Sequence, residues 1–123
     1  PLETINYFIS ACNEAGLDSM IDMIGIEQPF KILRLLKKLP TVVILHRGVD
    51  EETFDKHSPI PYLQINKIRS SFNVMISIAG GDTIREVQRA LFNSADIVVV
   101  WKDFYSPSSN TRALAREFLK EIK

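Results

Sequence analysis

The sequence predicts an α/β fold in which helices alternate with the strands of a parallel sheet. Two observations predict this class. Apolar residues repeat at helical spacing in one segment and form short β-branched runs in the next, and the two patterns alternate along the chain. The chain has 123 residues, 46% of them hydrophobic, which is enough for one domain with a buried core. We therefore expect a single α/β domain over residues 1–123.

Local signals place the elements of this fold. A helix over about residues 4–15 carries its apolar residues on one face and ends near Gly16. The apolar run over 18–26 predicts a buried strand, and Pro29 opens a helix that continues to Leu39. The same reasoning predicts, in order, a strand over 41–47, an exposed loop over 48–59, a helix over about 61–70, a strand over 73–79, a helix that begins at the capping box of Thr83 and Glu86, a strand over 96–100 and a last helix marked by Leu114, Phe118 and Ile122.

Two architectures fit this order of elements. One is a small open doubly wound domain with four strands. The other is half of an eight-stranded (β/α) barrel, a fold that typically needs about 250 residues. A first residue that is proline instead of methionine suggests a piece of a longer chain. The pattern of helices and strands is the same in both architectures, so it does not separate them.

Charge and cysteine content exclude several functional classes. Fifteen basic and fifteen acidic side chains balance, so no overall field attracts nucleic acid or an anionic membrane. The longest apolar runs are too short to span a bilayer. Cys12, His46 and His57 are too scattered for a metal site, and a single cysteine suits a reducing cytoplasm. We therefore expect a cytoplasmic globular protein without nucleic-acid or membrane partners.

The polar residues at the strand ends are the candidates for function, because parallel α/β sheets carry their sites at the carboxyl ends of the strands. Asp22 lies in an apolar run, where a carboxylate needs a cation, a hydrogen-bond donor or a polar cavity. The alternative is an acid satisfied by backbone groups or by a nearby lysine. His46 shares its direction with Val42 and Ile44 at the end of its strand, which suits either a proton-transfer group or a satisfied polar residue.

A second group of candidates forms a potential anion site. Gly80 and Gly81 stand between a strand and a helix, where backbone N–H groups can approach an oxyanion; the alternative is a tight turn. Lys102 either adds a point charge to such a site or is an ordinary surface lysine. Arg47 either closes its strand as a solvated charge or joins the anion site, and Trp101 is either an apolar anchor or an obstruction there.

Four segments, in this order and with these intervening helices, resemble the second half of hexulose-6-phosphate synthase: "SMIDMIGI", "VVILHRGVDEE", "VMISIAGG" and "ADIVVVWKD". This aldolase-type lyase belongs to the orotidine-monophosphate decarboxylase suprafamily, and the likeness runs through nearly the whole chain. The most specific motif is "LHRGVDEE" with a downstream "IAGG". The chain looks most like the archaeal form that is fused to a formaldehyde-activating domain.

The resemblance implies a (β/α)₈ TIM barrel of which the C-terminal half, strands five to eight, is present here. It also implies a lyase that interconverts hexulose 6-phosphate with ribulose 5-phosphate and formaldehyde through a Mg²⁺-stabilised enediolate. Carried over by position, Asp22 contacts the substrate, His46 relays a proton, and Gly80 and Gly81 hold the phosphate. The family's Asp-x-Lys-x-x-Asp metal motif is absent from this chain. We therefore expect this segment to bind the phosphate group (the phosphate grip) and to form part of the surface that holds the substrate. By itself it should be inactive. Its expected partner is the missing N-terminal half of the barrel, and its expected assembly is a homodimer.

The sequence departs from the family at one further place, because Trp101 and Lys102 stand where the family has glycine followed by arginine or a small residue. Two alternatives stay open. One is a non-catalytic barrel half that serves oligomerisation or sugar-phosphate sensing. The other is a decarboxylase of a keto-sugar-acid phosphate, which needs an arginine where this chain has Val49.

Overall fold

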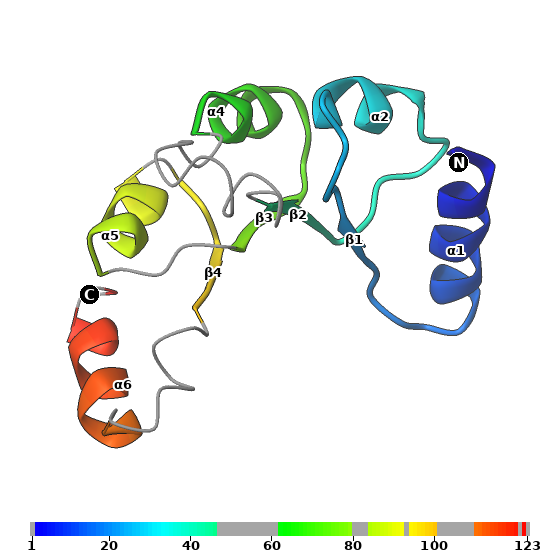
Figure 1. Cartoon of the computed structure of the whole chain (residues 1–123). Helices are drawn as coiled ribbons and strands as arrows, with labels where there is room; N and C mark the ends of the chain where they lie inside the picture. Colours follow the sequence, from blue (N-terminus) through cyan, green and yellow to red (C-terminus); the bar gives the residue numbers. More distant parts are fainter. Residues whose placement is uncertain are drawn as a thin grey trace.

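The computed structural model describes residues 2–46, 62–79, 84–92, 94–100, 110–120 and 122. Helices and strands alternate along these residues, as the hydrophobic pattern predicts (Figure 1). The elements are, in chain order, α1 (Leu2–Glu14), β1 (Met20–Asp22), α2 (Pro29–Leu35), β2 (Val42–His46), α4 (Tyr62–Ser71), β3 (Met75–Ala79), α5 (Ile84–Phe92), β4 (Ile97–Val99) and α6 (Thr111–Lys120).

The four strands form one parallel sheet in the order β1-β2-β3-β4, so each strand pairs with its neighbour in the sequence. A doubly wound sheet reverses its strand order at one point and carries helices on both faces. Crossovers between parallel strands are right-handed, so a sequential order places the crossover helices on one face. Figure 1 shows α2, α4 and α5 along one side of the curved sheet. The expected α/β class is confirmed, and this arrangement is consistent with half a barrel instead of a doubly wound domain.

The face of the sheet toward these helices, here called the outer face, carries the core. Its strand residues are buried with exposed fractions of at most 8%: Ile21, Val43, Leu45, Ile76 and Ile78. They form one cluster with buried helix residues that include Ile9, Leu33, Ile65, Ile68 and Ala90. Each large aliphatic side chain buried in this way stabilises the fold by about 1.5–3 kcal/mol. The outer face is therefore the main source of stability among the described residues.

The opposite face, here called the inner face, is apolar but partly open. Successive side chains of a strand alternate between faces, so Met20, Met75 and Val99 point away from the outer-face core. They are 49%, 43% and 41% exposed. Val42 lies in register between Met20 and Met75 and is buried. Half of a barrel would present an inner face of this kind, which is apolar, covered at its centre and exposed at both sides.

The end of α1 agrees with the sequence pattern. Gly16 adopts a φ of 71°, which a residue without Cβ reaches at low cost. Its N–H donates to the carbonyl of Asn13 at 3.2 Å, and the N–H of Leu17 donates to the carbonyl of Cys12 at 2.8 Å. These two bonds form a Schellman motif, which satisfies carbonyl groups that the helix end leaves free. The predicted stop at Gly16 is confirmed.

Strand β1 is shorter than predicted, because the chain turns directly after Asp22. A side-chain oxygen of Asp22 accepts the N–H of Ile24 at 2.9 Å, and the N–H of Ile26 donates to the carbonyl of Met23 at 3.0 Å. Gly25 has a φ of 72°, which completes the turn. The prediction of a buried strand over 18–26 is therefore wrong beyond Asp22, since an Asx-type turn competes successfully with strand pairing.

Helix α2 also ends earlier than predicted, at Leu35 instead of Leu39. Leu36 has an extended backbone with a ψ of 140°, so it cannot continue the helix. The next N–H, that of Lys37, donates to the side-chain oxygen of Asn6 on α1 at 2.9 Å. A bond between residues 31 positions apart replaces the last turn of the predicted helix.

The last helix begins at a cap that the sequence pattern did not reveal. The side-chain oxygen of Asn110 accepts the N–H of Ala113 at 3.1 Å, as an N-cap residue does. Phe118 lies in α6 as predicted, and it is buried, whereas Ile122 lies beyond α6 and is exposed. The predicted loop over 48–59 and the cap at Thr83 lie outside the described residues. Within the described ranges, no helix is long and apolar enough to cross a membrane.

Candidate functional site

The Asp22 side chain lies on the inner face at the end of β1, because it alternates with the buried Ile21. The sequence pattern predicts a buried carboxylate, and this prediction is wrong: Asp22 is exposed. Its strand lies at the edge of the described sheet, where no further strand covers it. One oxygen of Asp22 accepts the N–H of Ile24, so part of its role is structural. A carboxylate has about four acceptor positions, and the remaining ones are open to a ligand.

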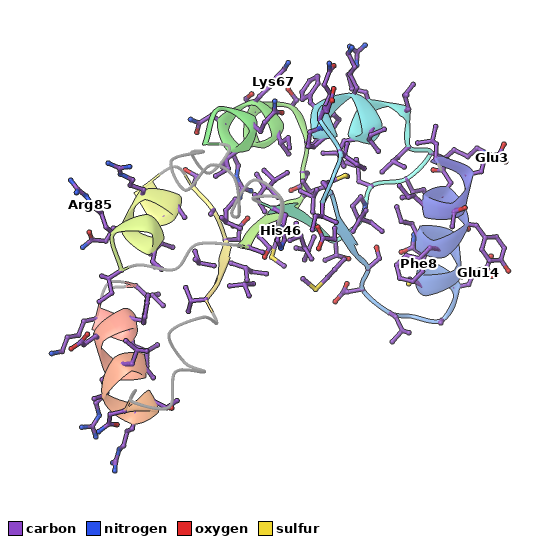
Figure 2. The ribbon with its side chains drawn as sticks, in the orientation of Figure 1. Glu3, Phe8, Glu14, His46, Lys67 and Arg85 are labelled. Atoms are coloured by element: carbon purple, nitrogen blue, oxygen red, sulfur yellow. The ribbon has the colours of Figure 1, made fainter. Side chains whose placement is uncertain are left out.

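His46 ends β2 on the same inner face. It pairs in register with Ala79 of β3, and both residues are half-buried. The predicted common direction of His46, Val42 and Ile44 is confirmed by the strand alternation. Figure 2 shows His46 near the middle of the sheet, while Lys67 of α4 and Arg85 of α5 project from the helices. An imidazole in this position is partly accessible to a small molecule on the inner face.

The structure brings Asp22 and His46 to one place. Asp22 is in register with Ile44, and His46 lies two residues further along the same strand as Ile44. Neighbouring strands are about 4.8 Å apart and each strand residue rises about 3.3 Å, so the two side chains lie within reach of one small molecule. An acid and a histidine on one partly open surface form a set of groups that can exchange protons with a ligand.

Sequence reasoning missed a third polar residue on the inner face, Ser77 of β3. Ser77 is in register with Ile44 and is fully buried. The signal was present in "MISIA", where a serine replaces an apolar residue at an alternating strand position. The structure therefore groups Asp22, His46 and Ser77, one from each of three adjacent strands, on a face that is otherwise mostly apolar.

The remaining candidates lie outside the described residues: Arg47, Gly80, Gly81, Trp101 and Lys102. They stay predictions as components of an anion site.

The described residues do not provide a complete magnesium site. Mg²⁺ requires oxygen ligands in near-octahedral geometry, and Asp22 offers one carboxylate on the inner face. Among the residues that the structure describes, no group of three or more His, Cys, Asp or Glu residues could hold a metal ion. Any magnesium at this face would need ligands from elsewhere in the protein.

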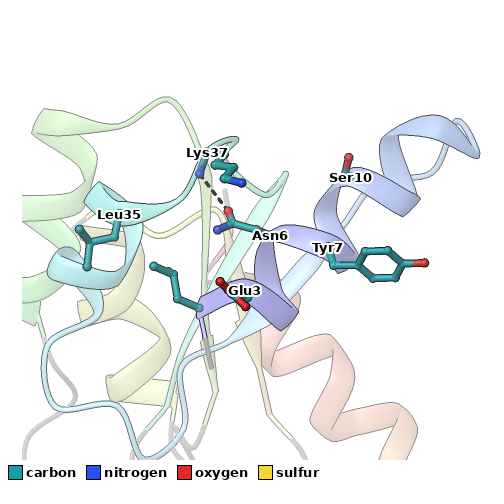
Figure 3. Close-up of a pocket in the computed structure, with 7 residues that line it drawn as sticks. Glu3, Asn6, Tyr7, Ser10, Leu35 and Lys37 are labelled. Atoms are coloured by element: carbon teal, nitrogen blue, oxygen red, sulfur yellow. Dashed lines mark hydrogen bonds between the residues drawn. The ribbon is translucent and has the colours of Figure 1, made fainter.

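A pocket of about 470 Å³ lies away from these residues, between α1 and the segment after α2 (Figure 3). It is lined by Leu2, Glu3, Asn6, Tyr7, Ser10, Leu35 and Lys37. Asn6 already accepts the backbone N–H of Lys37 there, as the dashed line in Figure 3 marks. None of the inner-face residues Asp22, His46 and Ser77 lines this pocket, and parallel sheets place their sites at the carboxyl ends of their strands. We therefore take the inner face at the carboxyl ends as the candidate site.

These features define a parallel α/β protein with helices along one face of its sheet and polar residues at the carboxyl ends of its strands. Comparison with known proteins relates the chain to bifunctional enzymes named Fae/Hps. It is 32% identical to the bifunctional enzyme Fae/Hps of Methanocella arvoryzae and 33% identical to that of Methanothrix thermoacetophila, each over 124 residues. It is 32% identical to that of Archaeoglobus fulgidus over 126 residues. The whole of this chain is covered in each case.

The match covers this chain completely but less than a third of each relative. The chain spans 30% to 31% of the length of these curated relatives. No family model matches the chain, and no solved structure matches it. The comparison therefore relates the chain to enzymes, without assigning it to one activity or confirming a TIM barrel.

The function expected from the resemblance is corrected by this comparison. The chain could be assigned the interconversion of hexulose 6-phosphate with ribulose 5-phosphate and formaldehyde only if its match lay in the Hps part of the relatives. The shared name joins two parts, Fae and Hps, and the match to less than a third of each relative does not identify the Hps half. The expectation is therefore wrong as an assignment for this chain, and so is the role of phosphate grip in that reaction. The relation to the bifunctional protein stands.

Proposed function

We propose that this chain forms one half of a (β/α)₈ barrel in an enzyme of formaldehyde-related metabolism, and that its inner face is one wall of the enzyme's small-molecule site. The observation that carries the proposal is the placement of Asp22 and His46 on a partly open inner face, at the carboxyl ends of adjacent strands. The names of the relatives support the enzymatic context. Parallel α/β barrels build their sites at this end of the sheet.

The barrel part of the proposal rests on the two faces of the sheet. The outer face is buried under helices, whereas Met20, Met75 and Val99 leave apolar surface exposed on the inner face. Strands β1 and β4 each have one described neighbour, so both edges of the sheet offer unpaired backbone groups. Four further strands from the rest of the protein would pair with both edges and cover the inner face. A second copy of the chain, as in a homodimer, would supply the same four strands.

The roles proposed for Asp22 and His46 follow from the chemistry of their side chains. Asp22 accepts hydrogen bonds from the ligand, and His46 donates or accepts a proton. We propose a sugar phosphate as the ligand, because Gly80, Gly81, Lys102 and Arg47 follow the same strand ends in the sequence and could hold a phosphate. Mg²⁺ belongs to the proposal as a cofactor whose ligands come mainly from outside this chain.

Calorimetric titration of the full-length protein with ribose 5-phosphate tests the site. Asp22→Asn and His46→Gln are each expected to weaken binding about tenfold, because the first removes a charge-assisted hydrogen bond and the second removes the imidazole that hydrogen-bonds to the ligand. Asp18→Asn is the matched control, since Asp18 accepts the hydroxyl of Thr41 before β1 and β2 begin. Absence of binding by the unmodified protein, or an equal loss in the control, would contradict the proposal.

A further inference from the structure

A buried hydroxyl on the inner face has no hydrogen-bond partner. Three buried side-chain atoms lack a partner in the described part of the chain: Gln64 Oε1, Arg69 Nε and Ser77 Oγ. The first two belong to α4 on the helix side of the sheet. Ser77 belongs to the centre of β3, and its exposed fraction is 0%. Buried polar groups are nearly always paired, so an unpaired hydroxyl at a sheet centre requires an explanation.

The position of Ser77 suggests the explanation. Asp22, Ile44 and Ser77 lie in one row across β1, β2 and β3. Because neighbouring strands are about 4.8 Å apart, Asp22 and Ser77 are separated by roughly 10 Å, with Ile44 between them. His46 lies two residues beyond Ile44 on β2, closer to the carboxyl ends of the strands. Asp22 and Ser77, which can form hydrogen bonds with the hydroxyl groups of a ligand, therefore lie on either side of the apolar Ile44 side chain.

This arrangement matches the chemistry of a carbohydrate. A sugar has a carbon skeleton that can lie on an apolar residue such as Ile44, and it carries oxygens on either side of that skeleton. A serine hydroxyl can donate to a carbonyl or hydroxyl oxygen and can also accept from a hydroxyl. The neighbours of Ser77 on β3 at this face, Met75 and Ala79, provide no competing polar side chain.

We propose that Ser77 is a specificity-determining residue of this site, whose hydroxyl binds a hydroxyl or carbonyl oxygen of the sugar part of the ligand. This inference rests on the proposed function, and it adds a recognition role that is separate from the phosphate. In the absence of the ligand the Ser77 hydroxyl contributes no hydrogen bond to the fold, so its removal affects binding and not stability.

Titration of full-length Ser77→Ala with ribose 5-phosphate and with inorganic phosphate, beside thermal unfolding, tests the proposal. We expect about a tenfold loss of affinity for ribose 5-phosphate, the effect of one lost hydrogen bond to a bound ligand. The affinity for inorganic phosphate and the unfolding midpoint should not fall. Ser77→Cys, which keeps the shape but weakens the hydrogen bond, should show a loss in the same direction. Ser70→Ala is the control, because the Ser70 hydroxyl already donates to the carbonyl of Lys67 in α4.

The outcomes separate this inference from the proposed function. Full affinity of Ser77→Ala for ribose 5-phosphate, or an equal loss for inorganic phosphate, would overturn the role of Ser77 while the site itself stands. A lowered unfolding midpoint in both Ser77 variants would assign the hydroxyl to the fold and overturn the role as well. An unmodified protein that does not bind ribose 5-phosphate would overturn the proposed function and this inference together.

Discussion

Arg69 of α4 forms an ion pair with Asp96, which directly precedes β4. The same guanidinium donates to the carbonyls of Val74 at 3.1 Å and Ser94 at 2.8 Å. The carboxylate of Asp96 also accepts the N–H of Ile76 in β3 at 2.8 Å. Two side chains thus tie a helix to the beginnings of two neighbouring strands, and hold β3 and β4 in parallel register.

Arg69→Met should destabilise the protein by about 1–3 kcal/mol, because the carbonyls of Val74 and Ser94 lose the guanidinium donor and the carboxylate of Asp96 loses its cationic partner. Urea unfolding measures the loss. Arg34→Met is the control, since Arg34 is an exposed residue of α2, and its effect should stay within about 0.5 kcal/mol. Equal losses in the two variants would show that the contacts of Arg69 contribute nothing beyond those of a surface arginine.

Replacement of the glycine after α1 tests the end of that helix. Gly16→Ala should cost about 1 kcal/mol, because a φ of 71° is unfavourable for a residue with a Cβ atom. No atom lies within 4 Å of the added Cβ, so the cost is conformational and not steric. Gly16→Asn should cost less, since asparagine tolerates this region. Thermal unfolding of the two variants measures these losses of stability. An alanine variant as stable as the unmodified protein would contradict the role of Gly16 at the helix end.

Two adjacent residues of β3 test the difference between the faces of the sheet. Ile76→Ala should cost about 2–5 kcal/mol, because Ile76 is completely buried on the outer face. Met75→Lys should cost within about 0.5 kcal/mol in the chain of residues 1–123, because Met75 is 43% exposed on the inner face.

The same Met75 variant tests the half-barrel proposal when it is made in the full-length protein. If further strands cover the inner face, a lysine there becomes a buried charge and the loss of stability should rise to several kcal/mol. Urea unfolding of both lengths gives the comparison. A loss that stays equally small in the full-length protein would contradict a closed barrel.

Two roles of Asp22 can be separated by substitution. Asp22→Asn keeps an oxygen for the N–H of Ile24 and should leave stability within about 0.5 kcal/mol, whereas Asp22→Ala should cost about 1 kcal/mol through the lost turn. Both variants should bind ribose 5-phosphate less tightly. If Asp22→Asn binds as tightly as the unmodified protein, the carboxylate serves the turn and not the site.

Patterns that act over short distances were predictable from the sequence. The alternation of strand side chains places His46 with Val42 and Ile44, and the glycine after α1 marks the helix end, because both effects depend on neighbours within a few residues. The alternating helices and strands likewise predict a parallel sheet. They do not predict the strand order, which the structure shows to be sequential.

Features that depend on distant or competing contacts were not predictable. Helix α2 ends early because Lys37 bonds to Asn6 of another helix, and β1 ends early because the Asp22 side chain bonds to the backbone of Ile24. The exposure of Asp22 follows from its place on an edge strand, and an apolar run does not reveal which strand is at the edge. Ser77 became a candidate only when its burial and its unpaired hydroxyl were known.

We propose that the inner face at the carboxyl ends of the strands is the ligand site, with His46 within it. The most direct test is an NMR titration of the full-length protein with ribose 5-phosphate that follows two assigned signals, the ring protons of His46 and the methyl group of Met23. His46 lies on the inner face, and Met23 is buried in the outer-face core. We expect the His46 signals to move as the ligand reaches saturation, while the Met23 signal stays in place. Unchanged His46 signals in the presence of bound ligand would contradict this proposal.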